Sequence, residues 1–371
     1  MLTANDEVLG HKLAGEWLER AEARALCSIV FSAMFARDVE IPEEAVERLL
    51  HASPTPESIV TLTSAFFAMT AFSAYAAKRD MVELCHRRLE EIVPTHAAHA
   101  PVAMAWVVLT RGCYKLHFDR DFWGALRCTR DAVARHEGSG AGPILFGRTL
   151  ITISCVLLGL FEQANEEAAR TVATTPAEGP EALSAEAFLC YVLIAQRRFE
   201  DAVALAIRVA RGKATMVGGL LGIYARFFQM EAHWFMGDRE MAKSEASALS
   251  DTMAKEPVFA MWYLAILARM RLDEGRADEA VALAERGYAQ SRDIRMGEMR
   301  RHALLLLVRA EAHHALGHDD IARDAIREAR EDILCRAALI PESESEARQA
   351  FLENYPDHKR TLELAREWLG E

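Results

Sequence analysis

The sequence predicts an all-α fold, a right-handed superhelical solenoid of about eight helix-turn-helix units with capping helices at its C-terminal end. A small residue recurs about every forty positions, at Ala45, Cys85, Ala125, Ala164, Ala202, Ala242, Ala280 and Ala322. Five residues before each lies a turn-like position: Glu40, Asp80, Arg120, Gly159, Arg197, Gly237, Gly275 and Gly317. One helical hairpin cannot bury its apolar stripe alone, so such units stack on their neighbours.

The last three units show the pattern most clearly. Ala242, Ala280 and Ala322 are each followed four residues later by an apolar residue, which places both on one helix face. The turns at 236–240, 274–279 and 316–320 put glycine where a helix ends in a left-handed residue, and acidic residues follow in the next helix. Arg120 and Arg197 depart from this pattern because they replace the turn glycine.

The two ends of the chain differ from the repeats. We expect a long first helix from Asn5 to Ala36, and a polar C-terminal cap from Glu342 to Leu369 that is broken at Tyr355-Pro356. This divides the chain into a repeat array over 1–337 and capping helices over 338–371. Proline- and glycine-rich linkers separate the units, and we expect no β-sheet. The predicted linkers are 53–56, Pro94, 138–143, 175–180 and 256–257.

Composition narrows the class of protein. The 371 residues carry a formal net charge of −12 and are 51% hydrophobic. This acidic balance disfavours binding to nucleic acid or to anionic membrane.

Three observations bear on where the protein resides. The longest apolar run, Thr149 to Phe161, is too short to span a bilayer, and the N-terminus has no secretory signal pattern. The seven cysteines have no Cys-x-x-Cys spacing and are expected to be core residues in a reducing compartment. We therefore expect a cytoplasmic protein.

A family resemblance rests on two segments. The segment Arg-Ala-Glu-Ala-His-His-Ala-Leu-Gly-His-Asp-Asp-Ile-Ala (309–322), echoed at 268–280, resembles tetratricopeptide repeats, although the period here is nearer forty than 34. Longer repeats of this kind resemble the superhelical sensor arm of the bacterial maltose-regulon activator. The ending at 351–365 resembles the ends of repeat regions attached to bacterial serine/threonine kinases and regulatory ATPases. The resemblance implies a superhelical arm of a bacterial signalling regulator.

Catalytic motifs are missing from the sequence. There is no P-loop, kinase signature, Gly-x-Ser-x-Gly elbow or His-Glu-x-x-His motif. His314 with His318, and His96 with His99, have spacings that metal ligands can show, but solvated helix ends explain them better. We expect no enzymatic activity, no cofactor and no metal site.

The candidate binding surface is the concave face, which the first helix of each hairpin lines in this repeat class. The residues expected there, eleven or eight positions before a recurring small residue, are Tyr114, His117, Ile153, Tyr191, Ile194, Glu231, Trp234, Arg269, Glu311 and His314. Tyr191 and Trp234 are expected to offer aromatic contact surface. Helix 149–161 is apolar all round, so either neighbouring helices or a partner covers it. A clamp for a peptide carboxylate built from inward asparagines is disfavoured, because none of the chain's three asparagines falls on an inward position.

Three functions remain open. The favoured one is a protein-interaction module, an adaptor or regulatory scaffold of a bacterial signalling system, that binds a partner helix or peptide in its groove. The alternative is a sensor arm whose superhelix changes conformation when it binds a small ligand or peptide. An enzyme with an unrecognised site is the third. The partner is expected to be another protein, neither nucleic acid nor membrane; a small ligand and a homo-oligomer are left open.

Overall fold

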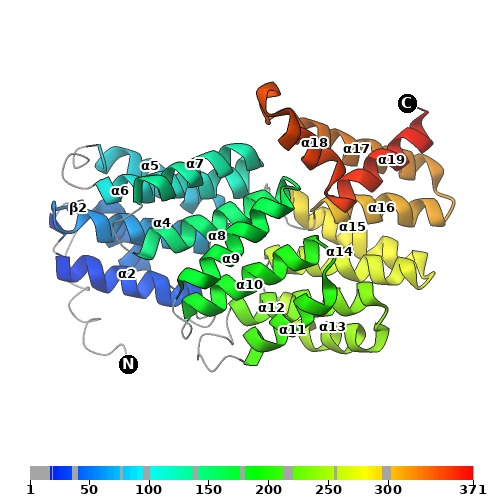
Figure 1. Cartoon of the computed structure of the whole chain (residues 1–371), viewed down its shortest axis with the longest axis horizontal. Helices are drawn as coiled ribbons and strands as arrows, with labels where there is room; N and C mark the ends of the chain where they lie inside the picture. The colour runs from blue at the N-terminus through cyan, green and yellow to red at the C-terminus, as the bar shows by residue number, and fades with distance from the viewer. Residues whose placement is uncertain are drawn as a thin grey trace.

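The computed structural model describes residues 17–18, 20–35, 41–75, 78–94, 101–136, 141–175, 180–211, 220–254, 257–294 and 302–370, and these residues form an all-α array, as predicted. Sixteen repeat helices make eight consecutive hairpins (Figure 1). The hairpins are α2 (Arg20–Phe35) with α3 (Glu43–His51), α4 (Ile59–Tyr75) with α5 (Arg79–Ile92), α6 (Pro101–Tyr114) with α7 (Phe122–His136), α8 (Ala141–Leu157) with α9 (Phe161–Thr174), α10 (Pro180–Ala195) with α11 (Phe199–Arg211), α12 (Leu220–Met236) with α13 (Arg239–Ala254), α14 (Pro257–Asp273) with α15 (Ala277–Ile294), and α16 (His302–Ala315) with α17 (Asp319–Ala337).

The recurring small residues lie on the second helix of each hairpin. All eight are buried, with at most 2% of their surface exposed. A larger side chain at such a position would overfill the space. The forty-residue period therefore marks a buried position on each second helix.

Six of the eight predicted turn positions adopt the left-handed conformation that ends a first helix. They are Arg120, Gly159, Arg197, Gly237, Gly275 and Gly317, with φ between 58° and 89°. The prediction for Asp80 is wrong, because α5 begins at Arg79 and Asp80 lies in its first turn, where an acidic side chain suits the helix dipole. Glu40 lies outside the described residues.

The expectation of no β-structure is wrong at one place near the N-terminus. Strand β1 (Trp17–Leu18) pairs in parallel with β2 (Ser53–Pro54), which lies in the linker between the first two units. The prediction of one helix over 5–36 is wrong at residues 17–18, which form β1, and α2 begins only at Arg20. Residues 5–16 lie outside the described part.

The C-terminal segment is broken at Tyr355, as predicted. A short 3-10 turn η2 (Glu342–Glu344) leads into α18 (Ser345–Glu353), and α19 (Pro356–Leu369) begins with proline at its first position. Helix α19 packs against α16 and α17. In Figure 1 the chain runs down through α8 to α13 and rises again to α18 (orange-red), which returns to the side of the molecule where α7 and α8 lie.

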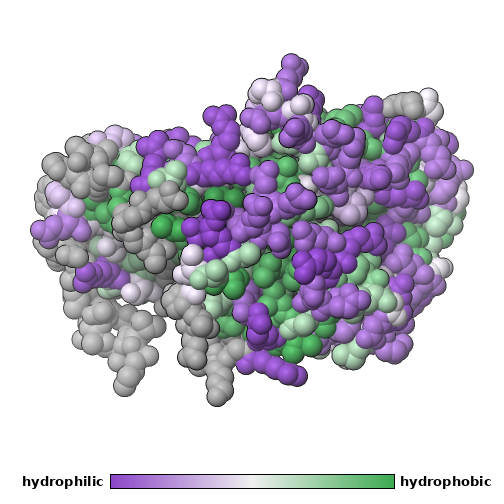
Figure 2. Space-filling model, viewed as in Figure 1, coloured by the Kyte–Doolittle hydropathy of each residue, from purple (hydrophilic) through white to green (hydrophobic). Residues whose placement is uncertain are grey.

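Most of the buried residues belong to one core that runs through the middle of the array. It includes Phe67 in unit two and reaches Phe351 in α18. Residues 149–159 in and just after α8 are all buried, so neighbouring helices cover the apolar helix noted in the sequence. The face seen in Figure 2 is mostly hydrophilic, with a hydrophobic area over α10 to α12. Within the described residues, no helix combines the length and apolar character needed to cross a membrane.

Candidate functional site

The candidate site is a cavity of about 400 Å³ between the first helices of units five to eight and the C-terminal cap. We call it the inner cavity. Helices α10, α12, α14 and α16 form one wall, and the junction of α18 and α19 forms the other. Its lining residues are Ile194, Ala195, Arg197, Phe199, Glu231, Phe235, Arg269, Asp273, Leu304, Leu307, Glu311, Tyr355, Pro356, Asp357 and Arg360. Its volume lies in the range of small-ligand pockets, about 300–1,000 Å³.

A charged network crosses the inner cavity and joins three helices. The guanidinium of Arg269 on α14 donates a hydrogen bond to Glu311 on α16 and lies 3.6 Å from Asp273. Arg360 on α19 donates to the other Glu311 oxygen at 3.3 Å. Burial alone would lower the pKa of Arg269, but the attraction of Glu311 and Asp273 outweighs it and raises that pKa. Glu311 thus links the repeat array to the cap.

An aromatic wall lies beside this network. The rings of Phe199 and Phe235 stack at 5.6 Å between centroids, and the guanidinium of Arg197 lies 5.9 Å from the Phe199 centroid. Phe235 is 38% exposed although it sits in an array whose other large side chains are mostly buried. The cavity therefore offers an accessible apolar surface next to cations and carboxylates, a combination that suits a ligand with both apolar and charged groups.

A second depression continues from the inner cavity over the turns of units four and five. We call it the turn groove. It measures about 700 Å³ and shares Ala195, Arg197 and Pro356 with the inner cavity. Its remaining lining residues are Gly159, Leu160, Phe161, Glu162, Gln163, Gln196, Arg198 and Asn354. The two spaces therefore adjoin at these three residues, one on the side of the first helices and the other on the turn face of the array.

Contacts far apart in the sequence hold the cap over these spaces. Asn354 donates its side-chain amide to the Gly159 carbonyl at 3.1 Å. Arg120 forms an ion pair with Asp332 on α17, and the rings of Phe122 and Phe351 lie 6.4 Å apart. The turns of units three and four are thus docking points for the C-terminal helices.

The structure brings four of the ten sequence-predicted residues into the inner cavity: Ile194, Glu231, Arg269 and Glu311. Three of them occupy the position eleven residues before the recurring small residue, one helical face repeated in consecutive units. Glu231 is 2% exposed, so its carboxylate lies at the floor of the cavity.

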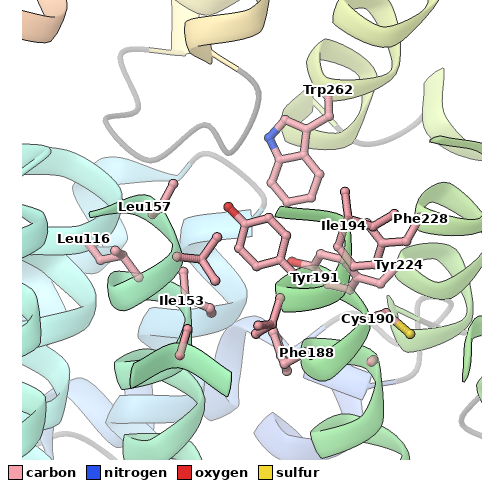
Figure 3. Close-up of a cluster of buried hydrophobic side chains, with 14 of the residues drawn as sticks. Leu116, Ile153, Leu157, Phe188, Cys190, Tyr191, Ile194, Tyr224, Phe228 and Trp262 are labelled. Carbon is pink, nitrogen blue, oxygen red and sulfur yellow. The ribbon is translucent and has the colours of Figure 1, made fainter. Parts of the chain in front are cut away.

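Two aromatic residues expected to offer contact surface are instead buried. Tyr191 is 1% exposed and stacks on Phe228 at 5.6 Å between ring centroids, within a cluster that includes Tyr224 and Trp262 (Figure 3). Trp234 is also 1% exposed; its indole N–H donates to Asp273 at 2.8 Å and Arg239 covers its ring at 3.5 Å. In this structure neither ring is available to a partner. Phe228 on the adjacent first helix α12 covers Tyr191, whereas Arg239 on α13, the second helix of the same hairpin, covers Trp234.

The other predicted residues lie away from the cavity. Ile153 is buried in the core around α8, and His117 is buried in the π-helical segment η1 (Lys115–Asp119) that extends α6. The hydroxyl of Tyr114 bonds with Arg79 and Glu83 of unit two. His314 is exposed and stacks on Trp368 of the cap, with centroids 4.4 Å apart.

The histidines considered as metal ligands have other partners where the structure describes them. Nδ1 of His318 lies 3.2 Å from Nδ1 of His313, and His314 stacks on Trp368. His96 and His99 lie outside the described residues. Among the residues that the structure describes, no group of three histidine, cysteine or carboxylate side chains is arranged to hold a metal.

Sequence reasoning missed the four lining residues of the inner cavity that the C-terminal cap supplies. Tyr355, Pro356, Asp357 and Arg360 line it, and they lie more than forty residues from the nearest first-helix residue of the cavity. It also missed Arg197, whose departure from glycine at a turn position was the one available signal. Predicting the cap residues required knowing that the array curves back on itself.

Solved structures with the same fold come from bacterial signalling. A Rap protein complexed with competence and sporulation factor is 12% identical, with a TM-score of 0.59 over 94% of this chain and 99% of that one. The Rap conjugation gene regulator of plasmid pLS20 in complex with the Phr* peptide is 13% identical, with a TM-score of 0.54 over 94% and 96%. The apo form of the quorum sensor NprR from B. thuringiensis is 12% identical, with a TM-score of 0.53 over 94% and 99%.

No protein-family model matches the sequence, and no curated protein matches it. The structural likeness extends over nearly the whole of each chain, so it covers the repeats and the cap together. The chain therefore has the tetratricopeptide-like helical-repeat fold of these regulators.

Proposed function

We propose that this chain is a regulatory protein that binds a short peptide in the inner cavity and, in response, changes how it interacts with a second protein. The observation that carries the proposal is the composition of the cavity, whose walls come from both the repeat array and the C-terminal cap. An occupant would contact both parts and so alter the free energy of their association.

The lining of the inner cavity supports a ligand with both apolar and charged groups. Phe199, Phe235 and Leu307 offer apolar surface, and Arg197, Asp357 and Arg360 offer charged groups beside it. A short peptide combines both kinds of group.

The fold comparison supports the same choice. Two of the solved structures with this fold are described as complexes with a competence and sporulation factor and with a peptide, and a third as a quorum sensor. Those ligands belong to those proteins; for this chain a peptide is our inference from the cavity.

The test is affinity selection with a synthetic pool of random hexapeptides, followed by calorimetry on the retained sequences. Phe235→Ala should weaken binding of a selected peptide about tenfold or more, because Phe235 is the exposed apolar wall of the cavity. Met241→Ala is the matched control, since Met241 is a 43% exposed apolar residue outside the cavity lining. Retention of no peptide, or equal loss in both variants, would contradict the proposal.

A further inference from the structure

Arginine occupies a turn position where its backbone conformation favours glycine. Arg197 has φ of 61°, in the left-handed region, which costs a residue with a side chain about 1–2 kcal/mol. The equivalent positions in the last three units, Gly237, Gly275 and Gly317, are glycine although a Cβ there would meet nothing within 4 Å. Glycine occupies these three positions because of the left-handed backbone conformation, since there is room for a side chain. A long charged side chain at such a strained position is a candidate for a functional role.

Arg120, the other arginine with a positive φ, has a clear structural role. Arg120 has φ of 58° and forms its ion pair with Asp332, 212 residues away. Its side chain thus joins unit three to the C-terminal helices.

Arg197 has no comparable carboxylate partner among the residues that the structure describes. The other arginines that line the two spaces each have a carboxylate partner. Arg198 pairs with Asp201, and both Arg269 and Arg360 pair with Glu311. The Arg197 side chain is exposed, lies near the Phe199 ring, and lines both the inner cavity and the turn groove. It is therefore a cation held at the junction of the two spaces and accessible to a ligand.

We propose that Arg197 binds a carboxylate of a short peptide that extends from the inner cavity into the turn groove, and that an adjacent apolar side chain of the peptide packs on Phe235. This inference rests on the proposed function. A guanidinium presents two parallel N–H donors that match a carboxylate, and an aromatic neighbour limits the orientations of the arginine. Since no ion pair of Arg197 must be broken, binding costs only the desolvation and ordering of its exposed guanidinium. The carboxylate is either the peptide's C-terminus or an aspartate or glutamate side chain.

The experiment compares two pools of random hexapeptides, one with free C-termini and one with amidated C-termini. Each pool is incubated with the full chain, and peptides retained through gel filtration are identified by mass spectrometry. Affinities of retained peptides are then measured for the parent, Arg197→Gly and Arg276→Gly. Arg276 is the control because it is exposed next to the turn residue of unit seven and lines neither space. We expect Arg197→Gly to weaken binding at least tenfold and Arg276→Gly to change it less than twofold.

Two further measurements separate ligand binding from a structural role. Arg197→Gly should unfold at the same temperature as the parent or higher, because glycine relieves the left-handed conformation. Removing the peptide carboxylate, by amidation or by Asp→Asn and Glu→Gln changes, should weaken binding to the parent but not to Arg197→Gly. Whichever change has this effect identifies the source of the carboxylate. Arg197→Asn, a residue that tolerates this conformation, repeats the test if the glycine variant folds poorly.

The outcomes distinguish this inference from the proposed function. If the parent retains peptides and Arg197→Gly binds them equally well, or if amidation and the amide substitutions weaken both proteins to the same extent, Arg197 is not the carboxylate site while peptide binding stands. If the parent retains no peptide from either pool, both proposals are wrong.

Discussion

The side-chain amide of Asn354 donates a hydrogen bond to the carbonyl oxygen of Gly159 at 3.1 Å, joining positions 195 residues apart. Gly159 is also the turn residue of unit four, and a Cβ on it would lie 2.3 Å from the Ala350 carbonyl oxygen. The absence of a side chain at this turn therefore lets α18 dock, and the docked helix places Pro356 and Asp357 over the inner cavity.

This docking can be tested by adding a single methyl group. Gly159→Ala should destabilise the chain by the cost of the left-handed conformation, about 1–2 kcal/mol, and in addition by the clash with Ala350. Gly237→Ala is the control, because its φ is also positive but nothing lies within 4 Å of its Cβ. Chemical denaturation should show the larger loss for Gly159→Ala, and hydrogen exchange should rise in α18 for that variant alone. Equal losses would show that the contact contributes nothing.

The recurring small residues are expected to be intolerant of larger side chains. Ala242→Leu and Ala280→Leu should each lower the free energy of unfolding by about 1–3 kcal/mol, because both positions are fully buried between paired helices. Ala282→Leu, on the exposed side of α15, should change stability little. Thermal unfolding that is unaffected by all three substitutions would mean that the forty-residue period does not mark helix contacts.

Trp234 should act on stability rather than on binding directly. Trp234→Ala is expected to cost about 3–5 kcal/mol of unfolding free energy, as large-to-small changes in a core do. Trp234→Phe, which keeps an aromatic ring but loses the hydrogen bond to Asp273, should cost about 1 kcal/mol. If Trp234→Ala left denaturation unchanged and abolished peptide binding, the ring would be a contact residue after all.

Two buried histidines predict loss of stability in acid. Burial and the nearby Arg336 charge lower the pKa of His358 to about 3, and burial with Arg120 and Arg336 lowers the pKa of His302 well below its usual 6.5. Both rings are neutral in the folded protein, and Nδ1 of His358 lies 2.8 Å from the Phe351 carbonyl, to which a neutral ring can donate. Below about pH 6.5 the two histidines become protonated in the unfolded chain but stay neutral in the folded chain.

The contribution of these two neutral histidines to the free energy of unfolding should therefore be fully present above about pH 6.5. It should decrease as the pH falls toward 3, by up to about 1.4 kcal/mol per pH unit for each histidine. Denaturation curves measured between pH 7 and pH 4 would show this. His358→Gln removes one titrating group and keeps a donor for the Phe351 carbonyl, so its stability should fall less steeply with decreasing pH. A slope identical to that of the parent would show that His358 does not contribute.

The hairpins and the cap break could be predicted from local sequence. The small residues, the turn glycines and Pro356 act on helices adjacent in the chain, where backbone conformation and close packing depend on a few neighbouring residues. Within the candidate site the same periodicity predicted Glu231, Arg269 and Glu311, because each lies at the same position of a repeated helix.

Local sequence could not predict which of the inward-facing residues remain accessible to a ligand. Tyr191 and Trp234 follow the same spacing as the cavity residues, yet Phe228 covers Tyr191 and Arg239 covers Trp234. Their burial depends on how closely neighbouring units approach, which is set by many side chains along both helices rather than by the repeat itself.

The sequence by itself determined the helices, their order and four residues of one wall of the inner cavity, because these follow from the repeated local pattern. Only the tertiary structure decided the second wall. The cap reaches the cavity because small rotations between successive units accumulate until α17 and α18 meet the turns of units three and four, where Arg120 pairs with Asp332 and Asn354 bonds to Gly159. That meeting joins segments about two hundred residues apart, and no local pattern encodes the sum of the rotations between them.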